Sequence, residues 1–89
     1  MRIELYPELD ACVETQAKRQ YDEIMRELLQ KGETEGELAE RLELLRLFLE
    51  SADFSRLRSE SEKHLMAGES LKFTLWLENG KPAYKMEIT

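Results

Sequence analysis

The Asn79-Gly80 pair constrains the fold of this chain more than any other feature of its sequence. Both residue types tolerate the positive φ angles of a type I′ turn, so the pair predicts a β-hairpin with a two-residue loop. The hairpin is expected to join two antiparallel strands, residues 71–78 and 81–88. A register slip of one residue would exchange the two faces of both strands, so the turn and the side-chain pattern support each other.

In this register the apolar side chains gather on one face of the hairpin: Leu71, Phe73, Leu75, Leu77, Tyr84, Met86 and Ile88. Pro82 falls at a position that is not hydrogen-bonded to the first strand, so its missing N–H points outward. We therefore expect the second strand to form an edge of the sheet. Residues 2–6 alternate between polar and apolar side chains, and a strand formed there should pair beside residues 71–78.

The stretch 38–49 is the most apolar run in the chain and predicts an amphipathic helix. At helical spacing, one line of side chains contains Leu38, Leu42, Leu45, Leu49 and Ala52. Leu44 and Phe48 widen this line to nearly half the circumference, more than one neighbour requires. We expect the helix to contact the preceding helix and, on its other side, either the C-terminal strands or a second copy of the protein.

A first helix is predicted from Pro7 to Lys31, followed by Gly32 as a left-handed cap. Its apolar stripe consists of Leu9, Val13, Ala17, Tyr21, Ile24 and Leu28. Thr34 and Glu37 match a capping box for the second helix, so the two helices should form an antiparallel hairpin.

A third, shorter helix should begin at the N-cap Asp53 and stop at Gly68. Its narrower buried stripe consists of Phe54, Leu57, Ser61 and Leu65. The predicted fold class is α+β, in a single domain of residues 1–89. The antiparallel helical hairpin and third helix pack on the C-terminal β-hairpin, and residues 2–6 are a candidate third strand.

Composition favours a cytoplasmic protein. The net charge of −6 repels phosphate backbones and anionic lipid, so nucleic acid is an unexpected partner and no membrane association is predicted. A single cysteine, Cys12, cannot form an internal disulfide and fits a reducing compartment. The sequence contains neither an apolar run long enough to cross a bilayer nor a signal-peptide pattern.

Four residues are candidates for an interface: Trp76, Arg41, Leu44 and Phe48. Trp76 falls on the polar face of the hairpin, where it either contacts a partner or is covered by a helix or the N-terminal segment. Arg41 lies within the apolar arc of the second helix. Its guanidinium could bind a carboxylate of a partner, but we favour contact with water or an internal glutamate.

The remaining candidates for a chemical site are His64, Cys12 and an acidic segment. His64 follows Glu60 by one helical turn, an arrangement compatible with a catalytic base but more typical of a structural pair. Cys12 is interpreted as a small packed residue rather than a reactive thiol. The acidic segment around Glu33 and Glu35 does not match a calcium-binding loop, and no metal or cofactor site is predicted.

We therefore expect a small non-enzymatic protein–protein interaction module, homodimeric or bound to another protein. The alternative is a nucleic-acid-associated accessory or regulatory protein that uses Lys72, Lys81, Lys85 and Trp76. A third hypothesis, an enzyme using His64 with Glu60, would need a concave pocket around that pair.

Overall fold

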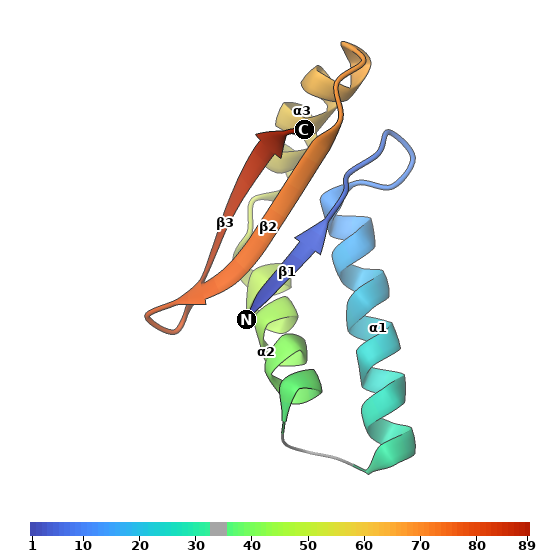
Figure 1. Ribbon diagram of the computed structural model, residues 1–89, viewed down its shortest axis with the longest axis vertical. Helices are drawn as coiled ribbons and strands as arrows, with labels where there is room; N and C mark the ends of the chain where they lie inside the picture. Colours follow the sequence, from blue (N-terminus) through green and yellow to red (C-terminus); the bar gives the residue numbers. More distant parts are fainter. Residues whose placement is uncertain (33–35) are drawn as a thin grey trace.

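The computed structural model describes residues 1–32 and 36–89. In chain order its elements are β1 (Arg2–Leu5), α1 (Val13–Lys31), α2 (Glu37–Ser51), α3 (Phe54–Met66), β2 (Leu71–Glu78) and β3 (Lys81–Ile88). The strands form one antiparallel sheet in the order β1-β2-β3, and the three helices lie on one face of it (Figure 1). The predicted α+β fold is confirmed.

The hairpin closes as the turn residues predict. Asn79 and Gly80 have φ angles of 53° and 77°, and the strands pair from Glu78 opposite Lys81 onward. The N-terminal strand β1 pairs with β2, as expected, so β1 and β3 form the two edges of the sheet. The predicted register and the edge position of the Pro82 strand are both confirmed.

The first helix begins later than the sequence predicts, at Val13 instead of Pro7. Glu8 and Ala11 exchange backbone hydrogen bonds of 2.9 and 3.2 Å, which close a tight turn where the first helical turn was expected. Leu9, assigned to the buried stripe from its spacing, is exposed at the tip of this turn. The prediction for residues 7–12 was therefore wrong.

Gln16 supplies the physical reason for the late start. Its side-chain Nε2 donates to the carbonyl oxygens of Tyr6 at 2.6 Å and Ala11 at 2.8 Å. Its Oε1 accepts from the backbone N–H of Tyr6 at 3.1 Å. One side chain thus satisfies backbone groups at both ends of the turn, and a helix starting at Pro7 would lose these bonds.

The other helix boundaries follow their capping residues. Gly32 ends α1 with a φ of 68°, and Asp53 caps α3 by accepting a 3.2 Å hydrogen bond from the backbone N–H of Arg56. The third helix ends at Met66, close to the predicted stop at Gly68. The proposed capping box involves Thr34, which lies outside the described residues.

The core forms where α2 meets both α1 and the sheet. Its members are Ile3, Leu5, Val13, Ala17, Ile24, Leu28, Leu44, Leu45, Phe48, Leu57, Phe73 and Leu75. Phe48 lies among the aromatic rings of Phe54, Phe73 and Tyr84, with centroid distances of 5.3, 5.5 and 5.7 Å. The wide apolar arc of α2 therefore contacts two neighbours, and both belong to its own chain.

Candidate interaction surfaces

Leu44 and Phe48 are core residues. Both side chains are 0% exposed, because α1 covers one side of the α2 arc and the sheet covers the other. The expectation that they keep apolar surface for a partner is therefore corrected. Helical spacing predicted the width of the arc but could not predict how much of it the sheet would cover.

Arg41 forms an ion pair within its own helix. Its Nη2 lies 3.1 Å from Oε1 of Glu37, one turn earlier, and both side chains are partly solvent-exposed. An exposed pair of this kind contributes little to stability. Arg41 also lines a polar groove between α1 and α2, together with Gln20, Glu23, Ile24, Glu27, Glu37 and Leu38. An internal glutamate is its partner, as favoured from the sequence.

Trp76 lies on the face of the sheet opposite the helices. It is half-buried in β2, between its register partners Arg2 of β1 and Ala83 of β3. Among residues 1–32 and 36–89, the helices lie on the other face of the sheet and β1 lies beside β2 within it, so these elements do not cross the outer face (Figure 1). Trp76 and Arg41 lie on different surfaces, so the structure does not combine the candidate residues into one site.

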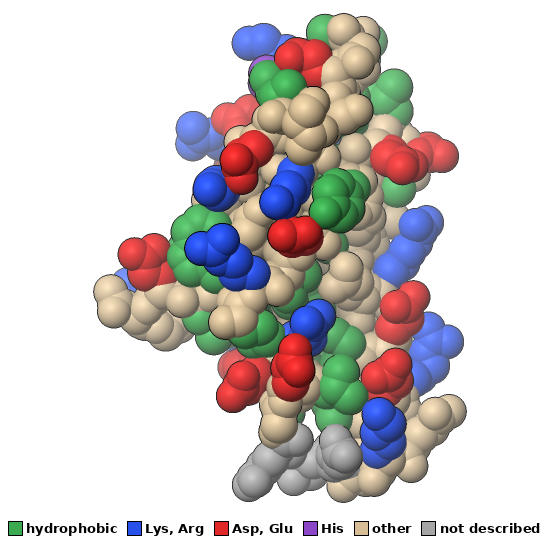
Figure 2. All heavy atoms as spheres, viewed as in Figure 1, with side chains coloured by type: hydrophobic (Ala, Val, Ile, Leu, Met, Phe, Trp, Pro, Cys, Tyr) green, Lys and Arg blue, Asp and Glu red, His purple; other side chains and the backbone are tan. Residues whose placement is uncertain are grey.

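Charges of both signs alternate over this outer face of the sheet (Figure 2). Lys72 lies 3.5 Å from Glu4 of β1, and Lys85 lies 3.3 Å from Glu87 on the same strand. Two of the three lysines near Trp76 therefore have carboxylate partners. Such pairing lowers the positive potential that a phosphate backbone would meet.

Glu4 is the best-defined ionisable group on the outer face. The Tyr6 hydroxyl donates a 2.8 Å hydrogen bond to its carboxylate, and this bond, followed by the charge of Lys72, lowers the pKa of Glu4 below its ordinary value. The same bond raises the pKa of Tyr6. The pattern of residues 2–6 predicted a strand but not this contact, because nothing in a period-two pattern indicates which polar neighbours bond.

A second surface lies between α1 and α2, at the end of the helical hairpin nearest their connection. It is an apolar groove of about 470 Å³ lined by Met25, Leu28, Leu29, Gly32, Ala39, Leu42, Glu43 and Arg46. Leu29 is 75% exposed at its rim. Sequence spacing placed Leu28 in the stripe but gave no reason to single out Met25 or Leu29.

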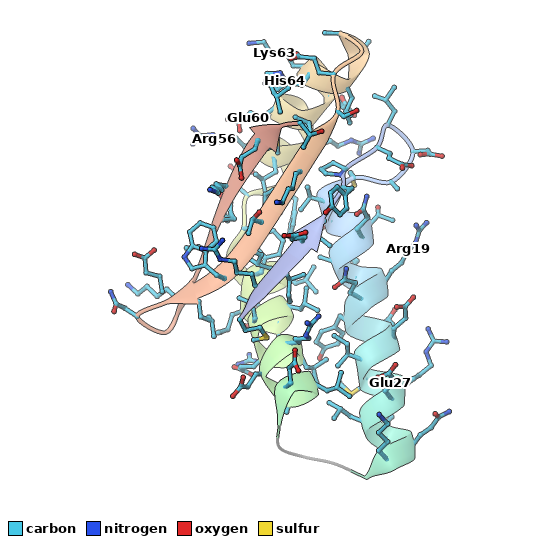
Figure 3. The ribbon with its side chains drawn as sticks, viewed as in Figure 1. Arg19, Glu27, Arg56, Glu60, Lys63 and His64 are labelled. Atoms are coloured by element: carbon cyan, nitrogen blue, oxygen red, sulfur yellow. The ribbon has the colours of Figure 1, made fainter. Side chains whose placement is uncertain are left out.

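A third surface follows the free edge of β3. Tyr84 is 42% exposed and Ile88 is 55% exposed, although both project toward the helical layer. A groove of about 480 Å³ runs beside them, lined by Glu60, Lys63 and His64 of α3 together with Leu71, Met86 and Ile88. The α3 side chains of this groove project along the β3 side of the molecule, whereas Arg19 and Glu27 project from α1 on the other side (Figure 3).

His64 has a different carboxylate partner from the one predicted. Its Nδ1 lies 3.0 Å from Oε1 of Glu69, while Glu60 pairs with Arg56 at 3.3 Å. The backbone N–H of Glu69 also donates to the carbonyl oxygen of His64, so both contacts close the C-terminal end of α3. The geometry matches a helix terminus and corrects the Glu60–His64 pairing.

Cys12 precedes the first turn of α1. Burial raises the pKa of its thiol, but the Thr15 hydroxyl, the amides of residues 14 and 15 and the charge of Arg58 lower it by more, so the net shift is downward. The Sγ lies 3.2 Å from the Thr15 hydroxyl. The adjoining cavity measures about 20 Å³, room for roughly one water molecule and no organic ligand.

Residues 1–32 and 36–89 contain no cluster of three or more His, Cys, Asp or Glu side chains that could hold a metal ion. Within the same residues, none of the helices combines the length and apolar character that a membrane span requires.

Comparison with known proteins found a partial similarity to an archaeal protein and a match to a protein family. An uncharacterized protein of Archaeoglobus fulgidus is 53% identical over 49 residues, which cover 53% of this chain and 58% of that relative. The chain thus spans less than two thirds of the relative's length. No solved structure matches. Residues 1–75 match one protein family, and the chain belongs to this uncharacterized family.

Proposed function

We propose that this protein is a small non-enzymatic interaction module that acts as a homodimer through the free edge of β3. The observation that carries the proposal is the exposure of Tyr84 and Ile88 on the helix-facing side of an edge strand. An edge strand presents unpaired N–H and C=O groups, and a second strand can add to it. Apolar side chains beside those groups add surface that association would bury.

The opposite edge is a poorer site for such pairing. β1 has only four residues, and the side chains flanking its free edge include the charged Arg2 and Glu4. The backbone of Tyr6, which follows β1, is already bonded to the Gln16 side chain. Short edges of this kind resist strand addition, whereas charge does not distinguish the two edges, because β3 also carries Lys81, Lys85 and Glu87. β3 has eight residues and ends in Ile88, so it is the edge suited to a partner.

The proposal includes a cytoplasmic location, which the single free thiol of Cys12 supports because the cytosol keeps thiols reduced. The small size of the chain supports association as well. A domain of this length buries a smaller fraction of its surface on folding than a larger domain does, so covering the β3 side would add to its stability.

Sedimentation velocity across micromolar concentrations tests the proposal. The expected result is a species of twice the chain mass, which Ile88→Lys converts to monomer. Leu29→Lys is the matched control, because it places the same charge at another exposed apolar side chain, in the α1–α2 groove. A monomer at every concentration, or loss of the dimer in the control alone, contradicts the proposal.

A role with nucleic acid is the second candidate. The outer face of the sheet carries Trp76 together with Lys72, Lys81 and Lys85. Many proteins bind single-stranded nucleic acid by stacking its bases on aromatic side chains beside cationic ones. The carboxylate partners of Lys72 and Lys85 weigh against it. A gel-shift series with single-stranded DNA and RNA at low salt decides, since electrostatic binding is strongest there. Retardation abolished by Trp76→Ala would favour this candidate, and no retardation would remove it.

A further inference from the structure

We infer that the two copies pair in one specific register, with β3 antiparallel to β3 of the partner subunit and the two-fold axis passing through Met86. Tyr84 then lies opposite Ile88 of the partner subunit, and Lys85 lies opposite Glu87 of the partner subunit. This inference rests on the proposed homodimer and adds its geometry. Three features decide the register: the backbone groups of the free edge, the position of Pro82 and the charges on the outer face.

The backbone groups available at the free edge follow from the hairpin register. Residues that flank a two-residue loop form a hydrogen-bonded pair, and bonded and non-bonded pairs then alternate along the strands. Glu78 and Lys81 are the flanking pair, so the residues whose backbone groups point away from β2 are Pro82, Tyr84, Met86 and Ile88. Three of them offer both an N–H and a C=O, whereas Pro82 offers only its C=O.

Pro82 excludes the registers that place it in the seam, which is the line where the two β3 strands pair. An axis at Tyr84 places Pro82 opposite Met86 of the partner subunit, and an axis at Lys85 places it opposite Ile88 of the partner subunit. Each leaves a carbonyl oxygen without a donor, and symmetry doubles the loss. With the axis at Met86, Pro82 lies beyond the last residue of the partner's strand, so its missing N–H removes no bond.

The charges on the outer face exclude the register whose two-fold axis passes through Glu87. An axis at Glu87 places two Glu87 side chains opposite each other, and an axis at Lys85 does the same to two lysines; like charges in these positions are destabilising. The Met86 axis instead forms two Lys85–Glu87 pairs across the seam. Lys85 and Glu87 pair within one chain, and each side chain is about half exposed. Both can therefore also contact the partner subunit across the seam.

On the helix-facing side the same register covers the apolar surface that the chain leaves open. Tyr84, Met86 and Ile88 would lie against the same three residues of the partner subunit in reversed order. These contacts extend the aromatic stack of Tyr84 on Phe73, whose centroids lie 5.2 Å apart. They also close the mouth of the groove between α3 and β3. The result is a continuous six-stranded sheet with helices on one face.

Cysteine cross-linking in a Cys12→Ser background tests the register. Met86→Cys lies on the axis, where hydrogen-bonded antiparallel residues have Cα atoms about 5.5 Å apart, within reach of a disulfide. Under mild oxidation we expect this variant to form disulfide-linked dimer much faster than Lys85→Cys, Glu87→Cys or Tyr84→Cys. Preferential cross-linking of any of these three, in a protein that sediments as a dimer, overturns the register but leaves the homodimer standing.

A charge exchange gives a second test by sedimentation. Lys85→Glu and Glu87→Lys each create two like-charge pairs across the seam, and each is expected to weaken dimerisation about tenfold. The double variant restores opposite pairs and is expected to recover the affinity of the original protein. Single variants that dimerise unchanged, or a double variant no better than the singles, contradict the inference. A monomeric original protein would instead defeat the proposed homodimer itself.

Discussion

The ring of Phe48 meets the ring of Tyr84 edge to face, with centroids 5.7 Å apart and planes inclined by 71°. This contact joins the centre of α2 to the edge strand β3. Phe48 also contacts Phe54 at the start of α3 and Phe73 in β2, so one side chain connects two helices with both strands of the hairpin. Tyr84 has Phe48 and Phe73 on its inner side and remains open toward the edge.

Replacing Phe48 should be among the most damaging single changes. Phe48→Ala removes a fully buried ring and leaves a cavity among its aromatic neighbours, so we expect a loss of about 3–5 kcal/mol in the free energy of unfolding. Urea denaturation followed by circular dichroism measures it. Leu29→Ala is the control, expected to change stability by less than about 0.5 kcal/mol because its side chain is mostly exposed. Equal effects would contradict the assigned core.

Gln16 should stabilise the turn before α1 by more than a partly exposed side chain usually does. Gln16→Ala removes three hydrogen bonds to the backbone of Tyr6 and Ala11, and we expect a loss of about 2 kcal/mol. Gln20→Ala, one turn later on α1, is expected to cost much less. Amide hydrogen exchange should also accelerate at Tyr6 in the first variant. Unchanged exchange at Tyr6 would show that the Gln16 bonds do not hold the turn.

The hairpin turn should be sensitive to a side chain at Gly80. Its φ of 77° is strained for any residue with a Cβ, although an added Cβ would meet no atom within 4 Å. Gly80→Ala should therefore cost about 1–2 kcal/mol through backbone conformation alone. Asn79→Gly is the matched variant, because glycine accepts the same positive φ, and its stability should stay close to the original. Urea midpoints compare the two, and equal losses would argue against the type I′ turn.

The pKa of Glu4 offers a direct test of the outer-face geometry. Tyr6→Phe removes the largest cause of its lowering, so the pKa should rise toward the ordinary value of 4.5 but stay below it because Lys72 remains. A titration of the Glu4 carboxyl carbon by NMR measures the change. An unaltered titration would mean that the hydroxyl does not bond to the carboxylate in solution.

The sign of the pH effect follows from the direction of that shift. Because the folded pKa of Glu4 is lowered, its contribution to stability is present above the unfolded pKa and disappears as the pH falls through the folded pKa. Tyr6 behaves oppositely: its raised pKa means that the contribution is present below its unfolded pKa and is lost at alkaline pH. Tyr6→Phe should therefore flatten both dependences.

Local chemistry explains which parts of the fold were predictable. Asn79-Gly80 specified the turn and hence the complete β2–β3 register, since each pair follows from the one before it. Gly32 and Asp53 specified where helices end and begin through their own backbone preferences. These features depend on residues close together in the chain, so the sequence by itself determined them.

Tertiary structure decided the rest, because it depends on contacts between distant residues. Gln16 displaces the start of α1 by bonding to Tyr6, ten residues away. Helical periodicity does not reveal that these hydrogen bonds compete with the first helical turn. Leu44 and Phe48 became core because the sheet covers the arc of α2, while Tyr84 and Ile88 stayed exposed because β3 lies at the sheet's edge. Apolar pattern identifies the side chains able to be buried, but the order of the strands and the placement of the helices determine which ones are covered.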